Sequence, residues 1–320
     1  MKSTITLCQA IDQYIEWQRD HGAKFQSSAR ALRHFSKTMG NGIRSDAVSD
    51  DAVLDYLAGK GPLTRTRANR YGVLTGFYRY AISRGYATRS PLPPAEKEPR
   101  EPKSAPPYLY SRDEMQRLLD AVEVSRRHAF QLDGDTLRTL LLLLYGTGLR
   151  LGEALNLTIR DTDLSQAVLR VRNAKFYRNR LVPVGPQLTY FLKAYAARRV
   201  NRRLPLGQDS AFLANRDGSR LAQKTVQNAF ANLLRTAGIR HTDKRRQSPR
   251  LHSMRHTFAV NRLNAWYRDG ADVQRLLPVL STYLGHIDLN GTQVYLTMTP
   301  ELLQEASLRF QRYAQGGRHE

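Results

Sequence analysis

The chain has 320 residues, 41% hydrophobic and 9% aromatic, so it is long enough for two ordinary domains with sizeable cores, and global disorder is excluded. Its formal net charge of +22 at pH 7, with 50 basic against 28 acidic residues, favours a polyanionic partner such as nucleic acid over a merely solvated basic surface. The single cysteine, Cys8, excludes an intrachain disulfide and any metal site made of several cysteines.

The first part of the chain has the apolar periodicity of helices. Four helices are expected, over residues 4–20, 25–38, 46–58 and 63–84. Charges interrupt the apolar positions of the first, which is therefore an amphipathic helix and not a signal peptide. The longest apolar run of the chain, residues 140–145, is too short to cross a bilayer, so we expect a soluble, cytoplasmic protein.

A proline-rich segment follows this helical region. Residues 90–107 hold seven of the fourteen prolines and have no apolar period, which is typical of an extended, semi-rigid linker. We therefore expect a helical domain over residues 1–89, this linker, and a second domain over residues 108–320.

Beyond the linker both helical and strand patterns occur. Ser111 and Glu114 have the spacing of a capping box, and a buried helix is expected over 135–146. Residues 167–173 and 180–184 are rich in β-branched residues, which predicts two short antiparallel strands joined by a loop. Further helices are expected over 186–203, 223–237, 249–263, 272–284 and 299–314. The predicted fold class is mainly α with a small antiparallel β-sheet.

The helix expected at 249–263 has an unusual start. Ser248 can cap it, and Pro249 suits its first position. His252, Arg255 and His256 then gather near its N-terminus, although the helix dipole disfavours positive charge there. A bound anion would resolve this conflict.

Two other segments concentrate basic residues. The helix expected at 63–84 carries four arginines for which we expect one basic, DNA-contacting face: Arg65, Arg67, Arg70 and Arg79. The loop at 235–250, which contains Lys244, Arg245 and Arg246, suits either a DNA-backbone contact or a localisation signal. Nothing in the N-terminal helical region looks catalytic.

The sequence lacks the motifs of several enzyme classes. It has no P-loop, no dinucleotide-binding glycine pattern, no zinc-protease motif and no serine-hydrolase elbow. A metal-dependent nuclease needs clustered carboxylates, and Glu153, Asp161 and Asp163 are better explained as caps or solvated charges. We therefore expect neither a metal nor a cofactor.

Basic and hydroxyl residues are more informative. Phosphoryl transfer without a metal needs cations for the phosphate oxygens, a nucleophile, and an acid for the leaving oxygen. Each candidate taken alone has an ordinary explanation, such as an ion pair, a hairpin tip, a structural histidine or a core tyrosine. The candidates in chain order are Arg150, Lys175, His252, Arg255, His286 and Tyr295. Only their combination points to chemistry.

This combination resembles the tyrosine recombinases of the phage-integrase family. The segments that carry the resemblance are "GTGLRLGEALNLTIRD", "AKFYRNRLVPV", "RLHSMRHTFAV" and "YLGH" followed by "TQVYLTMTPELL", and it covers residues 107–314. It implies a site-specific DNA recombinase or integrase, with a helical SAM-like core-binding domain ahead of a catalytic domain. The 31 residues from Arg255 to His286 exceed the spacing of compact members, which favours a mobile-element member similar to those of transposons or integrons.

The resemblance implies a role for each residue. Tyr295 is the nucleophile, and its attack on a DNA phosphodiester forms a 3′-phosphotyrosyl bond and frees a 5′-hydroxyl. Arg150 and Arg255 hold the non-bridging oxygens, where planar guanidinium groups match phosphate geometry. Lys175 protonates the leaving oxygen, and His252 assists proton transfer at the tyrosine.

The remaining residues have lesser or competing roles. The resemblance implies that His286 hydrogen-bonds the phosphate and that Glu153 is the acidic residue supporting the site. His256 has no chemical role in the family pattern and is expected only to support the site. Tyr283 and Tyr313 are rival nucleophiles, and we interpret both as structural.

The resemblance also implies an assembly. The substrate is double-stranded DNA, and the apolar helix expected at 299–314 docks on a neighbouring protomer in a tetramer; packing of this helix on its own domain is the alternative. Three other functions stay open on the sequence: a type IB topoisomerase-like relaxing enzyme, a non-catalytic DNA-binding regulator, and a metal-dependent transposase. The sequence gives neither the target site nor the choice among integration, excision and transposition.

Overall fold

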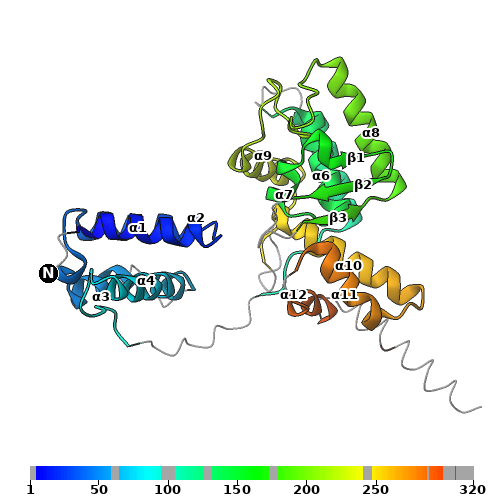
Figure 1. Ribbon diagram of the computed structural model, residues 1–320. Coiled ribbons are helices and arrows are strands. Elements are labelled where there is room, and N and C mark those ends of the chain that lie inside the picture. The colour runs from blue at the N-terminus through cyan, green and yellow to red at the C-terminus, as the bar shows by residue number, and fades with distance from the viewer. Residues whose placement is uncertain are drawn as a thin grey trace, which may run out of the picture. The chain divides into compact units, whose positions relative to one another are not determined.

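The computed structural model describes residues 5–58, 65–94, 105–125, 132–172, 179–240, 247–286, 288–297 and 307. Its contacts divide the chain into two compact units, Met1–Ser104 and Ala105–Glu320 (Figure 1). The predicted fold class is confirmed, because the described residues are mainly helical with a small antiparallel sheet in the second unit. No helix among them is both long and apolar enough to cross a bilayer.

The described part of the first unit is a bundle of helices. They are α1 (Leu7–Asp20), α2 (Gln26–Met39), α3 (Asp50–Ala58) and α4 (Arg65–Ser83), with a 3-10 turn, η1 (Ser45–Ala47), before α3. Helices α1, α2 and α4 pack against one another, and α3 packs against α2 and α4. Leu32, Phe35 and Phe77 are fully buried in the core between them.

The four helices expected in this unit are present, each beginning later than predicted, and α1 and α3 are the two whose starts are displaced most. Thr6 and Ser49 accept hydrogen bonds through their side chains from the backbone N–H groups of Gln9 and Ala52. Such caps satisfy N–H groups that have no partner inside the helix, so α1 and α3 begin immediately after them.

The second unit contains the sheet and the remaining described helices. The helices are α5 (Arg112–Ser125), α6 (Gly134–Thr147), α7 (Leu151–Asn156), α8 (Pro186–Asn201), α9 (Gln223–Thr236), α10 (Leu251–Arg268), α11 (Val273–Leu284) and α12 (Asn290–Gln293). Two 3-10 turns accompany them, η2 (Ile159–Asp161) and η4 (Val294–Thr297). The predicted helix at 299–314 lies outside the described residues, apart from position 307.

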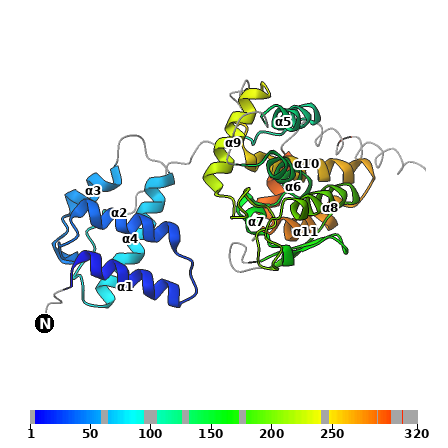
Figure 2. The same cartoon turned by 90° about the horizontal axis from the view of Figure 1, so that it is seen from above.

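Helix α6 lies at the centre of the second unit, with α5, α8 and α10 packed around it (Figure 2). Leucines cover its whole circumference, and Leu140, Leu141 and Leu143 are fully buried. A helix that is apolar on every side needs neighbours on every side. It ends at Gly148, whose φ of 63° is in the left-handed region that glycine adopts readily, and the chain then turns into α7.

The sheet has three antiparallel strands in the order β1 (Thr162–Asp163), β2 (Val168–Val171) and β3 (Arg180–Pro183). The two strands predicted from the sequence are β2 and β3, and β1 was missed because two residues carry no alternation. Leu169 and Val182 pair across β2 and β3 and are both buried. The register also pairs Val171 with Arg180, and β3 contacts α11.

The predicted start of α10 at Ser248 and Pro249 is wrong. The helix begins at Leu251, because the preceding chain is extended and held by Gln247, whose backbone N–H donates to the Pro106 carbonyl at 2.9 Å. The side chain of Gln247 adds a second hydrogen bond, to the Ala105 carbonyl at 2.9 Å. Positions just after 250 therefore form the first turn of α10.

Candidate active site

Arg255 is the buried cation around which the site is built. It lies on α10 with 1% of its surface exposed, and its two terminal nitrogens donate to the carbonyls of Gly148 at 2.8 Å and Leu284 at 2.7 Å. These carbonyls lie at the C-terminal ends of α6 and α11, where the helix dipole favours a cation. Burial and the nearby Arg150 lower the pKa of Arg255 to about 10, so the guanidinium stays charged at neutral pH.

Arg150 joins the same two regions from the start of α7. Its backbone N–H donates to Glu153 at 3.0 Å, one side-chain nitrogen donates to the second oxygen of Glu153 at 2.9 Å, and another donates to the Gly285 carbonyl at 2.9 Å. Its side chain is 29% exposed, so part of this guanidinium faces solvent. Arg150 is therefore both fixed in direction and accessible to a ligand.

Glu153 connects Arg150 to a third arginine, Arg180 on β3. Arg180 donates to both oxygens of Glu153, at 3.1 and 2.8 Å, and its Nε donates to the Tyr283 carbonyl at 2.8 Å. Burial alone would raise the pKa of Glu153, but the hydrogen bonds and charges of Arg180 and Arg150 outweigh it and lower the pKa. The carboxylate therefore stays ionised.

The sequence reading missed Arg180. The signal was a single charged residue at the start of an otherwise apolar strand, and nothing local distinguishes such a residue from an ordinary edge position. The turn after α11 also depends on Arg180: Gly285 has a φ of 68°, and an added Cβ there would lie 2.7 Å from the Arg180 guanidinium. Glycine is required at 285 for both reasons.

Tyr295 lies on η4 and is 2% exposed. Its hydroxyl oxygen is 3.1 Å from Nδ1 of His256, and its ring stacks on that of His286 with centroids 6.1 Å apart. Nδ1 of His286 is in turn 2.6 Å from the hydroxyl of Thr292, a fully buried residue that the sequence reading also missed. Burial raises the pKa of Tyr295, and the charges of Arg255 and Arg150 oppose this rise.

Two histidines occupy successive turns of α10. His252, in the first turn, is exposed, and its ring packs edge-on against that of His256 with centroids 4.7 Å apart. The resemblance implies that His252 assists proton transfer at the tyrosine and gives His256 only a supporting place. The observed hydrogen bond to the Tyr295 oxygen belongs to His256, because η4 packs beside the second turn of α10.

The histidines of the site are neutral at pH 7. Burial, followed by the charge of Arg255, lowers the pKa of the half-buried His286 to about 4, and desolvation by the surrounding protein, together with the charge of Arg255, shifts the pKa of the more exposed His252 in the same direction. Burial and the neighbouring His252 and Arg255 lower the pKa of His256 to about 3. The described cluster therefore holds three arginines against one glutamate, an excess of two positive charges (3 − 1 = 2). Such a cluster can bind a phosphate group.

Tyr283, one rival of Tyr295, lies within α11 as expected. Its ring stacks on Phe258, and its hydroxyl donates to the Pro183 carbonyl at 3.1 Å. The other rival, Tyr313, lies outside the described residues. Lys175, Lys244, Arg245 and Arg246 also lie outside them, so their placement stays a prediction.

The arginines of α4 lie outside this cluster, in the first unit. Nine residues separate Arg70 from Arg79, and at 3.6 residues per turn this places them on roughly opposite sides of the helix. Arg70 lies over the ring of Tyr56, 5.3 Å from its centre, whereas Arg79 is exposed. Arg67 is partly buried on the side of Arg70, and Arg65 begins the helix. Arg70 and Arg79 therefore do not share one face of α4, and a DNA contact through the four arginines stays a prediction.

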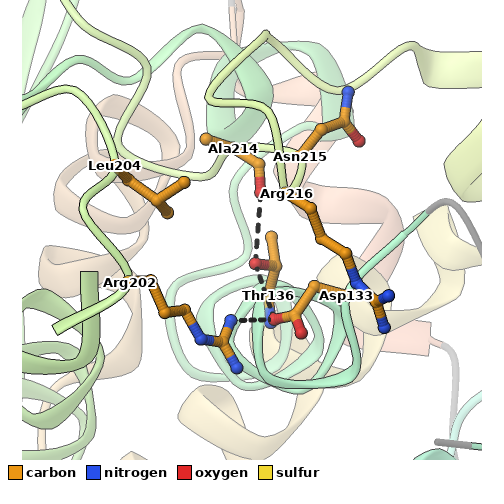
Figure 3. A pocket seen from close by; sticks show the side chains of 7 residues that line it. All are labelled: Asp133, Thr136, Arg202, Leu204, Ala214, Asn215 and Arg216. Atoms are coloured by element: carbon orange, nitrogen blue, oxygen red, sulfur yellow. Dashed lines mark hydrogen bonds and ion pairs between the residues drawn. The ribbon is translucent and has the colours of Figure 1, made fainter.

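A cavity of about 390 Å³ lies at the other end of α6 (Figure 3). There the Asp133 carboxylate accepts a hydrogen bond from the backbone N–H of Thr136 and forms an ion pair with Arg202. The Thr136 hydroxyl donates to the Ala214 carbonyl at 3.2 Å. The 14-residue helix places this cavity about 21 Å from Gly148 at 1.5 Å per residue. It takes no part in the arginine and histidine cluster. No group of three or more metal-binding side chains occurs among the described residues.

Comparison with known proteins agrees with this geometry. The phage integrase family pattern matches residues 109–301. "Putative integrase/recombinase y4rB" of Sinorhizobium fredii is 38% identical over 96% of this chain and 98% of its own length. Tyrosine recombinase XerD of Pseudomonas aeruginosa is 30% identical over 84% of each chain.

Solved structures share the fold. The Tn1549 transposon integrase in complex with circular intermediate DNA matches with a TM-score of 0.66 over 96% of this chain and 99% of that chain, at 17% identity. A lambda integrase tetramer bound to a Holliday junction matches with a TM-score of 0.64 over 92% of this chain and 78% of that chain, at 16% identity.

Proposed function

The chain belongs to the phage integrase family and is a tyrosine recombinase; from this premise we propose that Tyr295 cuts DNA at a specific site and holds the cut end covalently. The observation that carries the proposal is the position of the Tyr295 oxygen, which contacts His256 beside the charged Arg255. A phenol is a weak nucleophile until its proton is removed; the nearby arginines favour the phenolate, whereas burial disfavours it, so the reaction needs a base at the Tyr295 oxygen.

The scissile phosphate is proposed to bind between Arg150 and Arg255. Arg255 uses two of its five N–H donors on carbonyls, and Arg150 is partly exposed, so both retain donors for phosphate oxygens. The N-terminal turn of α10 lies beside them and adds its positive partial charge. Binding of this anion offsets the excess positive charge of the cluster.

The histidines and Lys175 complete the proposed chemistry. Because Thr292 occupies Nδ1 of His286, the Nε2 atom of that ring is available to the phosphate. Exposed His252 is proposed to assist proton transfer, and Lys175 to protonate the 5′-oxygen as it leaves. The bond energy is kept in the 3′-phosphotyrosyl ester, so rejoining needs no nucleotide cofactor.

The wider assembly is also proposed. The helical first unit would grip the duplex as a core-binding domain, with residues 90–107 as the linker to the catalytic domain. A tetramer on paired sites, joined through the segment at 299–314, would exchange strands in the integration, excision or transposition of a mobile element. The likeness to the putative integrase/recombinase y4rB and to the integrases solved with DNA supports this proposal by analogy. A cytoplasmic location is proposed together with this activity.

A covalent-capture experiment tests the proposed function and also finds the target site. Full-length protein is mixed, in EDTA, with a library of nicked duplexes whose central sequence is random, and DNA that stays bound after denaturation is sequenced. We expect the wild type to capture one related set of sequences. Tyr295→Phe should capture none, whereas Tyr283→Phe, which loses only the bond to the Pro183 carbonyl, should capture the same set. Equal capture by the wild type and Tyr295→Phe would overturn the proposal.

A further inference from the structure

The roles proposed above give His256 no part in the chemistry, although its ring contacts the Tyr295 oxygen. The ring nitrogen Nδ1 of His256 lies 3.1 Å from the Tyr295 oxygen, a hydrogen-bond distance. Both side chains are fixed: Tyr295 is 2% exposed and His256 is partly buried on the second turn of an 18-residue helix. The Tyr295 oxygen therefore already has a fixed hydrogen-bond partner, and His256 accepts the Tyr295 proton in the tautomer that is protonated at Nε2.

The chemical form of His256 suits an acceptor. Five groups face or approach it: His252 and Arg255 on α10, Arg250 at the start of α10, His286 after α11, and Tyr295 on η4. Four of these are basic, and together with burial they keep the imidazole neutral. A neutral imidazole whose Nδ1 accepts from a hydroxyl carries its proton on Nε2.

We infer that His256 is a catalytic residue that removes the Tyr295 proton during strand cleavage and returns it during rejoining. The inference rests on the proposed role of Tyr295 as nucleophile. In cleavage the Tyr295 O–H bond breaks and its proton moves to Nδ1 of His256, while the phenolate oxygen forms a bond to phosphorus. The bond from phosphorus to the 5′-oxygen breaks with its electron pair, and that oxygen takes a proton from Lys175. Rejoining reverses each transfer.

The substrate itself supplies the driving force. In the free enzyme the surrounding cations disfavour a second proton on His256, so the tyrosine keeps its hydrogen. A phosphate bound at Arg150 and Arg255 brings a negative charge that favours the protonated imidazole. His256 therefore becomes a better base when DNA is bound, which limits formation of a free phenolate in its absence.

His252 is less well placed for this transfer. It is exposed, and its ring contact is with His256 and not with the tyrosine. From this position it can pass charge or a proton between His256 and solvent. The substitution of His252 is therefore compared with the same substitution of His256 on the same helix.

The test uses single-turnover cleavage of the captured duplex by full-length protein. The variants are His256→Ala, His256→Asn and His252→Asn, and asparagine keeps a hydrogen-bonding atom near the place of Nδ1 but cannot accept a proton at neutral pH. We expect both His256 variants to cleave about 100-fold more slowly than the wild type. Thermal unfolding and a DNA gel shift verify that the variants fold and bind; if His256→Ala does not fold, His256→Asn decides.

Two readouts separate proton transfer from positioning. The rate of His256→Asn should rise about tenfold per pH unit from pH 7 to 9, because the phenol then loses its proton to hydroxide, while the wild-type rate changes little. A substrate with sulfur in place of the bridging 5′-oxygen, which leaves without protonation, should rescue Lys175→Ala and not His256→Asn.

The possible outcomes are distinct. Wild-type rates in His256→Asn, or rates reduced in His256→Ala alone, would overturn the inference, because a hydrogen bond without proton transfer would then suffice. The inference would also be overturned if His256→Asn showed the pH dependence of the wild type while His252→Asn cleaved slowly, with a rate that rises with pH. That result would assign the removal of the Tyr295 proton to His252. Failure of the wild type to form any adduct would instead remove the proposed function on which the inference rests.

Discussion

The two ends of α6 hold arginines in different charge environments. Among the ion-paired side chains at the N-terminal end two arginines face two aspartates, a balance of zero, whereas at the C-terminal end three arginines share one glutamate. The residues are Arg198, Arg202, Asp133 and Asp135 at the first end, and Arg150, Arg180, Arg255 and Glu153 at the second. Balanced ion pairs hold a helix end in the fold, and their arginines have little charge left to bind an added anion. The unbalanced cluster is complete only with a further anion, and Tyr295 lies beside it.

Replacement of one arginine by alanine at each end of α6 should separate the effect on cleavage from the effect on stability. Arg150→Ala is expected to slow covalent-adduct formation about 1000-fold, because a preorganised donor to the phosphate is lost, with little change in melting temperature. Arg202→Ala should leave the rate per folded molecule unchanged and cost about 2 kcal/mol of stability, since Asp133 loses its ion pair. Single-turnover kinetics and urea unfolding measure the two effects. An equal loss of rate in both variants would contradict the comparison.

Removal of the one carboxylate should be the largest stability change at the unbalanced end. Glu153→Gln leaves the nearly buried Arg180 without its ionised partner, so we expect a loss of about 3 kcal/mol in the free energy of unfolding. Asp135→Asn at the balanced end, where the arginines are more exposed, should cost about 1 kcal/mol. Urea denaturation compares them, and a smaller cost for Glu153→Gln would show that the glutamate is not needed to hold Arg180.

Two glycines in the left-handed region offer a finer comparison. Gly270 has a φ of 70° with open space around it, whereas Gly285 has a φ of 68° and faces the Arg180 guanidinium. Gly270→Ala should cost about 1 kcal/mol of backbone strain. Gly285→Ala should cost about 2 kcal/mol and also reduce cleavage, because Arg180 and the turn that holds His286 must shift. Thermal unfolding that ranks the two variants equally would argue against the close approach of Arg180.

Acidification should weaken the unbalanced end. The pKa values of His252, His286 and His256 are about 4, 4 and 3, all below the usual 6.5. The unfolded chain therefore binds more protons than the folded chain below pH 6.5, and stability falls as the pH drops from 6.5 toward 4. We expect a loss on the order of 1 kcal/mol by pH 5, measured by urea unfolding, and a smaller loss in His256→Asn. A flat profile would mean that these histidines are not held neutral.

Much of this site could be predicted from sequence because its residues lie in short motifs at fixed spacing. "RLHSMRH" places His252 and Arg255 on one helix, and "GHIDLNGTQVY" brings His286 and Tyr295 close in the chain. The fold class likewise followed from local periodicity.

The missed features depend on contacts between distant segments. Arg180 meets Glu153 across 27 residues, and the carbonyl partner of Arg255 at Gly148 lies 107 residues away. The start of α10 was misplaced because Gln247 is held by residues more than a hundred positions earlier. The local sequence pattern carries no information on such long-range pairings. For the same reason the sequence favours His252 as the partner of the tyrosine, whereas His256 makes that contact.

Mapping of the covalently linked peptide tests the central claim most directly. Wild-type protein captured on its nicked site is digested with a protease and a nuclease, and the peptide that carries a nucleotide is sequenced by mass spectrometry. The account predicts a nucleotide attached to the tyrosine of "GTQVYLTM", at Tyr295. Attachment at Tyr283, at Tyr313 or at any other residue would contradict it.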